Sequence, residues 1–94
     1  MEEQKKDDLR IGVIGIIIEN RLEQSQNVNR ILTDYGYIIR GRMGIPNIGE
    51  NFCAISLIVE GTNDDIGAMT GKLGRLKGVK VSSTLIKKEK KWNS

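Results

Sequence analysis

The apolar residues of this chain follow two kinds of pattern, one typical of strands and one typical of helices. Residues 10–18 are almost continuously apolar and include five isoleucines and a valine. This stretch is too β-branched and too short for a helix, so it predicts a strand covered on both faces. Within residues 24–35 the apolar positions instead follow the spacing of one helix face, as Val28, Ile31, Leu32 and Tyr35. Gly36 then stands where a left-handed C-terminal cap is expected.

The second part of the chain predicts two strands, a second helix and a final strand. Residues 38–45 and 52–60 predict strands, separated by a turn over residues 46–51 that contains proline, glycine and two asparagines. Thr62 and the following Asn-Asp-Asp predict a capped helix start, with carboxylates at the positive end of the dipole. That helix extends to about Leu76, is closed by Gly78, and is followed by a strand over residues 79–86.

The order β-α-β-β-α-β predicts an α+β fold, the ferredoxin-like sandwich. Right-handed crossovers in two βαβ halves give a four-stranded antiparallel sheet with both helices on one face. The first and third strands, which are the most apolar, would be central. Residues 10–87 form this domain, with a polar tail at residues 1–9 and a basic tail at residues 88–94.

A sheet covered on one face leaves the other face exposed, and here that face is predicted to be apolar. An apolar centre with a polar rim is typical of an interface, so we expect a homo-oligomer, either dimer or tetramer. The first strand is apolar at both parities, so its sequence leaves open which side meets the helices. The candidate interface residues are Ile14, Ile16, Ala54, Ser56 and Ile58.

The composition of the chain excludes several classes of function without identifying one. The 94 residues include no histidine, which removes the usual general base and the commonest metal ligand, and Cys53 is the only cysteine. We therefore predict no enzyme activity, no metal and no cofactor. No apolar stretch approaches membrane-spanning length, and the polar start lacks a signal-peptide core, so the expected location is the cytoplasm.

Two arginines and a stripe of glycines are the candidate interaction features. Arg40 and Arg42 fall on one predicted strand face, where Gly41 and Gly44 leave room for an anion beside the backbone. The alternative is that these arginines pair with acids across an interface. In the second helix, glycines at 67, 71 and 74 indicate either tight packing within the chain or close approach of another subunit.

The sequence also resembles a known family. The segments Gly41-Arg42-Met43-Gly44-Ile45-Pro46 and Gly61-Thr62-Asn63-Asp64-Asp65-Ile66-Gly67, together with residues 10–17 and 55–59, are similar to those of the regulators of the iron-only hydrogenase system. The resemblance covers almost all of residues 10–87. That family is similar in fold to amino-acid-binding ACT domains and to the C-terminal domain of the nickel-responsive repressor.

The resemblance implies a ligand-sensing regulatory oligomer that binds a small effector or a partner protein. Arg40 and Arg42 predict that a small effector would be anionic or zwitterionic. Nickel sensing through histidines is excluded, because the chain has none. In ACT domains the effector lies beside the first strand–helix loop at a subunit boundary. That position corresponds to Glu19, Asn20, Arg21 and Gln24.

Two other classes of function are weighed against this one. A nucleic-acid-binding module would use the sheet face and the lysine-rich tail, where Lys87, Lys88, Lys90 and Lys91 cluster within a net charge of +3. The sheet lacks the paired aromatics that stack bases in such folds, which weakens this hypothesis. A small acylphosphatase-like enzyme would need acid–base groups beyond the scattered carboxylates of this chain.

Overall fold

The fold is the predicted ferredoxin-like sandwich. The computed structural model describes residues 8–19 and 22–88. Its elements are β1 (Leu9–Glu19), α2 (Leu22–Asp34), the short 3-10 turn η1 (Gly36–Ile38), β2 (Ile39–Ile48), β3 (Phe52–Thr62), α3 (Asn63–Gly74) and β4 (Val79–Lys87). The α+β class and the order of strands and helices are confirmed.

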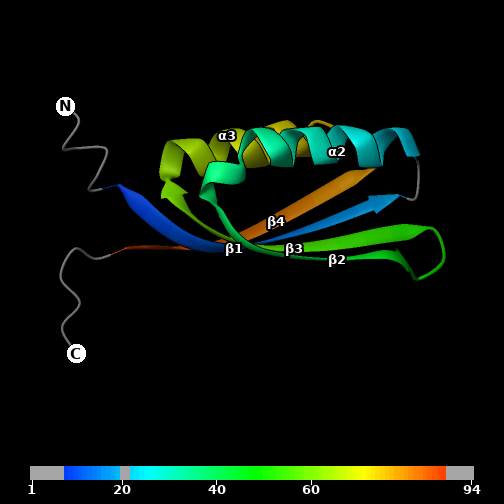
Figure 1. Ribbon diagram of the computed structural model, residues 1–94, viewed down its shortest axis with the longest axis horizontal. Helices are drawn as coiled ribbons and strands as arrows, with labels where there is room; N and C mark the ends of the chain where they lie inside the picture. The colour runs from blue at the N-terminus through cyan, green and yellow to red at the C-terminus, as the bar shows by residue number, and fades with distance from the viewer. Residues whose placement is uncertain (1–7, 20–21, 89–94) are drawn as a thin grey trace.

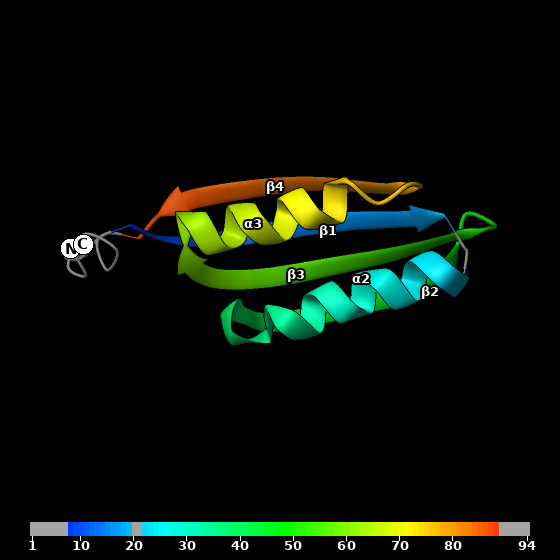
Figure 2. The same ribbon diagram turned by 90° about the horizontal axis from the view of Figure 1, so that it is seen from above.

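Four antiparallel strands form one sheet in the order β2-β3-β1-β4, so β1 and β3 are central, as predicted. Both helices lie in one layer on the same face of the sheet (Figure 1). Seen from above, α2 lies toward the β2 edge and α3 toward the β4 edge (Figure 2). The other face carries no helix among the described residues.

The hydrophobic core lies between the sheet and the two helices. β1 contributes its even-numbered isoleucines to it, and each helix contributes one apolar face. The members with the largest fully buried side chains are Ile14, Ile16, Ile18, Leu32, Leu57, Ile66, Met69 and Leu73. Assigning Ile14 and Ile16 to an exposed interface is therefore wrong: both are 0% exposed, because their side of β1 faces the helices.

The odd-numbered side of β1 lies on the uncovered face of the sheet. Pairing places Val13 opposite Ile58 and Ile17 opposite Ala54, so these residues share that face with Ser56. We call it the open face and define it by its strand residues: Ile11, Val13, Gly15, Ile17, Gly41, Met43, Ile45, Ala54, Ser56, Ile58, Glu60, Lys80, Ser82, Thr84 and Ile86. Three of the five predicted interface residues, Ala54, Ser56 and Ile58, do lie on it.

The helix ends were predicted with mixed success. Thr62 caps α3 by accepting a hydrogen bond from the Asp65 N–H at 3.0 Å, and Asp64 and Asp65 stand in the first turn, as expected. Gly36 is not a left-handed cap, since Gly49 and Gly78 are the glycines with positive φ in the described chain. Instead, the chain after α2 continues into the η1 turn, where the Ile38 N–H donates to the Tyr35 carbonyl at 3.0 Å.

Candidate functional site

A groove of about 310 Å³ lies between α2 and the β2–β3 hairpin, near the end of the sheet where β1 finishes. Its lining is mostly apolar, with a few polar groups contributed by α2 and β2. We call it the arginine groove. It is lined by Ile18, Ser25, Asn29, Arg42, Gly44, Ile45, Pro46, Cys53, Ala54 and Ile55. Apolar walls with a few convergent polar groups are typical of small-molecule sites.

Arg42 is the charged residue of this groove. It stands opposite Leu57 in the β2–β3 ladder, and because Leu57 is buried beneath the helices, Arg42 lies on the helix side of the sheet. Its Nη2 donates to Oδ1 of Asn29 on α2 at 2.6 Å. This bond holds the guanidinium at the rim of the groove, where its remaining donors are available to a ligand.

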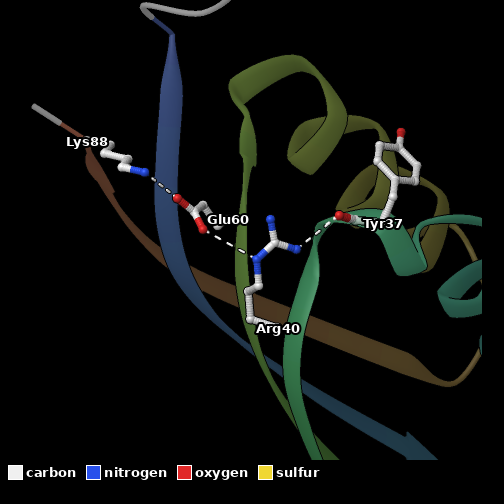
Figure 3. Close-up of polar contacts among 4 residues, drawn as sticks. All are labelled: Tyr37, Arg40, Glu60 and Lys88. Atoms are coloured by element: carbon white, nitrogen blue, oxygen red, sulfur yellow. Dashed lines mark hydrogen bonds and ion pairs between the residues drawn. The ribbon is translucent and has the colours of Figure 1, made fainter. Parts of the chain in front are cut away.

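Arg40 lies elsewhere, so the prediction that both arginines share one face is wrong. The β2–β3 register shifts between Ile39 and Gly41, and this irregularity reverses the alternation that the sequence suggests. Arg40 Nε donates to Glu60 Oε1 at 3.3 Å, and Arg40 Nη1 donates to the Tyr37 carbonyl at 3.0 Å (Figure 3). Arg40 is thus part of a surface ion pair, apart from the arginine groove.

Glu60 is the centre of that surface cluster. Lys88 Nζ donates to its Oε2 at 2.5 Å, opposite the bond from Arg40 (Figure 3). The hydrogen bond and charge of Lys88, with a smaller contribution from Arg40, lower the pKa of the Glu60 carboxyl. The cluster joins the start of β2, the end of β3 and the end of β4, which is a structural role.

The residues predicted from the first strand–helix loop do not gather in the groove. The Glu19 N–H donates to the Gly78 carbonyl at 2.9 Å, and Gln24 Nε2 donates to the Lys77 carbonyl. Both therefore contact the connection between α3 and β4. Asn20 and Arg21 lie outside the described residues, so their role stays a prediction.

Sequence reasoning missed three polar residues of the groove. Ser25 and Asn29 are four residues apart on α2, next to the buried Val28, and this i, i+4 spacing was a usable signal. The third is Cys53, which is half-buried and whose Sγ donates to the Pro46 carbonyl at 3.0 Å. The thiol is therefore one wall of the groove.

The glycines of α3 do not pack tightly within the chain. A Cβ added at Gly67, Gly71 or Gly74 would meet no heavy atom within 4 Å beyond the local helix backbone. All three border a shallow second groove of about 460 Å³ between α3 and β4, together with Thr70, Val79, Lys80, Val81 and Ser83. The packing interpretation of this stripe is thus wrong for the described chain.

Within residues 8–19 and 22–88, no group of three Cys, Asp or Glu side chains is placed to hold a metal ion. Neither α2 nor α3 is long and apolar enough to cross a membrane.

Comparison with protein families identifies one that matches most of the chain. Residues 10–83 match the TM1266-like family model, described as "Iron-only hydrogenase system regulator, putative". The uncharacterized protein TM1266 from Thermotoga maritima is 35% identical in sequence. It superposes with a TM-score of 0.80 over 84% of this chain and 99% of its own. No curated protein sequence matches the chain.

More distant solved structures share the fold. The ACT domain of the GTP pyrophosphokinase from Chlorobium tepidum is 18% identical, with a TM-score of 0.66 over 79% of this chain and 96% of its own. The nitrogen regulatory PII-like protein CPII from Thiomonas intermedia K12, in its apo form, is 16% identical. Its TM-score is 0.55 over 83% of this chain and 91% of its own. At these identities the likeness shows the fold alone.

Proposed function

The chain belongs to the TM1266-like family of iron-only hydrogenase system regulators, and on that premise we propose that it is a non-enzymatic, ACT-like regulatory module. It acts as a homo-oligomer and senses a small anionic or zwitterionic effector. The arginine groove carries this proposal, because it combines an arginine and two hydrogen-bonding side chains with an apolar floor. Regulation is also the role named for the PII-like neighbour.

The chemistry of the groove indicates the class of effector. The Arg42 guanidinium suits a carboxylate or phosphate, and Asn29 and Ser25 add one amide and one hydroxyl. The apolar walls favour a ligand with a short hydrocarbon part. A groove of about 310 Å³ is at the small end of the range for ligand sites, so the expected effector has the size of an amino acid or a small organic acid.

Calorimetry with two arginine variants tests the groove. A thermal-shift screen of amino acids and small organic acids supplies the ligand, since binding raises stability with ligand concentration. A charged hydrogen bond contributes about 1.5–3 kcal/mol, so Arg42→Ala is expected to weaken binding at least tenfold. Arg40→Ala is the matched control, because Arg40 is outside the groove and bonds to Glu60. Equal affinity in the wild type and Arg42→Ala would refute the proposed site.

We propose that the oligomer forms through the open face. Several large apolar side chains on it are between 39% and 65% exposed, namely Ile11, Val13, Ile17, Met43, Ile45, Ile58 and Ile86. Such a row is costly to leave in water, at roughly 25 cal/mol per Å² of apolar surface. A second open face of the same composition would cover it. A dimer or tetramer is the expected state, in a cytoplasmic setting.

Nucleic-acid binding remains the alternative function, and we do not favour it. Lys80 is the basic side chain among the strand residues that define the open face, and isoleucine, valine and methionine predominate around it. Phosphate neutralisation requires several basic contacts. Affinity for single-stranded or duplex probes that survives deletion of residues 87–94, and falls steeply with salt, would reverse this preference.

A further inference from the structure

β4 forms one edge of the sheet, and its backbone hydrogen-bonding groups alternate in direction. The Gly78 carbonyl accepts from Glu19 and the Lys88 N–H donates to the Leu9 carbonyl, each at 2.9 Å. Both contacts fix the even-numbered residues as those whose backbone groups face β1. The N–H and C=O of Val81, Ser83 and Leu85 therefore point outward. No strand pairs with them among the described residues.

The two edges of the sheet differ in their protection against pairing. β2 has register shifts at both ends and contains Pro46, features that natural sheets use to block edge-to-edge contact. β4 pairs with β1 in unbroken register from Val79 to Lys87 and contains no proline. Its middle, Val81 to Leu85, contains no charged residue. β4 is thus the edge that is open to another strand.

The middle of β4, Val81 to Leu85, is complementary to itself when read in the opposite direction. Antiparallel pairing about a twofold axis at Ser83 sets Ser83 against its own copy and Val81 against Leu85 of the other copy. On the opposite side of the strand it sets Ser82 against Thr84. Apolar residues thereby meet apolar residues and hydroxyls meet hydroxyls, the cross-strand pairs that stabilise antiparallel sheets. The outward groups of Val81, Ser83 and Leu85 fall into hydrogen-bonded pairs in this register.

The surface above β4 leaves space for such a neighbour. The groove between α3 and β4 includes Val81 and Ser83, and on the helix side it is bordered by glycines at 67, 71 and 74. Because these three glycines have no side chains, the space beside the β4 edge is open from the helix layer as well. A neighbouring strand along β4 would therefore explain the row of glycines in α3, which packing within the chain does not explain.

We infer that β4 is a docking edge for β4 of a second copy of this chain, paired antiparallel about a twofold axis through Ser83. The two sheets then join into one continuous sheet. This contact is separate from the open face and holds whether or not the open face also pairs. If both the β4 contact and the open-face contact form, their two twofold axes give a tetramer. This is one of the two oligomeric states proposed above.

Charge complementation at the axis tests the register. Ser83 is exposed, so Ser83→Lys and Ser83→Glu are compatible with folding. In each homodimer the new charge faces its own copy and is expected to weaken β4 pairing by roughly tenfold or more. An equimolar mixture of Ser83→Lys and Ser83→Glu should restore β4 pairing in a heterodimer. Native mass spectrometry with one variant isotopically labelled measures that heterodimer. Gln26→Lys and Gln26→Glu are the matched controls, because Gln26 is exposed on α2, away from both β4 and the open face, so mixing these two variants should restore nothing.

Amide exchange provides a second measurement that does not depend on these variants forming mixed species. In concentrated wild-type protein, the amides of Val81, Ser83 and Leu85 should exchange at least about tenfold more slowly than in Ser83→Lys. The amides of Ser82 and Thr84 face β1 and should stay protected in both proteins, which establishes that the variant is folded.

The absence of the open-face contact and the absence of the β4 contact would give different experimental results. If the open face does not pair, the edge amides stay protected while the particle is a dimer. If the β4 inference is wrong, the amides of Val81, Ser83 and Leu85 exchange at solvent rates in concentrated wild-type protein, and mixing the Ser83 variants restores nothing. Either of those two results overturns the docking edge.

Discussion

The two faces of β1 are built from nearly the same residues and have opposite environments. On one side, Ile14 and Ile16 are 0% exposed beneath the helices; on the other, Val13 and Ile17 are 49% and 43% exposed. Hydrophobicity therefore does not decide which side is the core. What decides it is the side on which the two crossover helices pack. The other side of β1 keeps apolar residues that the described part of the chain leaves uncovered.

The largest expected difference between the faces comes from placing a charge on each. Ile16→Lys puts an ammonium group into the fully buried core without a partner, a cost of several kcal/mol, so the chain should not fold. Ile17→Lys puts the same charge on the exposed side and should leave the secondary structure intact. Circular dichroism of both variants at neutral pH makes the comparison. Similar spectra for the two would contradict the assignment of the faces.

A second prediction separates folding from association. Ile58→Lys lies on the open face, 44% exposed, and should break the open-face contact while leaving each chain folded. Light scattering on the wild type should give a mass above the 10.5 kDa of one chain, and the variant should give half the wild-type mass. Leu22→Lys, an equal change at a 76% exposed position at the start of α2, should leave the mass unchanged. A wild type that is already monomeric would refute the open-face oligomer.

The two glycines of β1 compare the same two faces through a substitution with a smaller expected effect on stability. A Cβ at Gly12 would overlap Leu85 and stand 3.1 Å from the Thr84 carbonyl oxygen, whereas a Cβ at Gly15 would meet nothing within 4 Å. Gly12→Ala is therefore expected to cost about 1–3 kcal/mol through overpacking. Gly15→Ala should be neutral or slightly stabilising, because it restricts the unfolded chain. Urea unfolding midpoints of the two variants measure the difference, and an equal loss in both would contradict it.

The smallest expected effect concerns the polar end of the open face. The pKa of Glu60 is lowered in the folded state by its hydrogen bond with Lys88. Its contribution to stability is therefore complete above the unfolded value of about 4.3, and is lost as the pH falls through the lower folded value. The difference in unfolding midpoint between the wild type and Glu60→Gln should thus be small at pH 7 and disappear in acid. A difference that grows on acidification would contradict this sign.

The fold could be predicted because each element has its own periodicity. Three residues at helical spacing in α2, followed by Tyr35 just after its end, and the capped start at Thr62 mark the helices. The turn residues separate the strands. The parity of β1 could not be predicted, since both of its sides are apolar and period-2 analysis needs one polar side.

The candidate site was predictable only in part. Arg42 was identified from its glycine-rich setting, but its separation from Arg40 depends on a register shift that leaves no mark in the alternation of side chains. Asn29 and Ser25 enter the groove because α2 lies toward the β2 edge. That placement follows from tertiary packing, and the helical pattern of the sequence does not contain it.

The described chain enters and leaves the sheet side by side, since the Lys88 N–H bonds to the Leu9 carbonyl at 2.9 Å. β1 and β4 run antiparallel from that point. A tensile force applied between the two ends would therefore load this ladder one hydrogen bond at a time, peeling β4 away from Lys87 toward Val79. The domain would yield by unzipping from its edge, at lower force than a sheet sheared along its strands, while the arginine groove at the far end of β1 would be disturbed last.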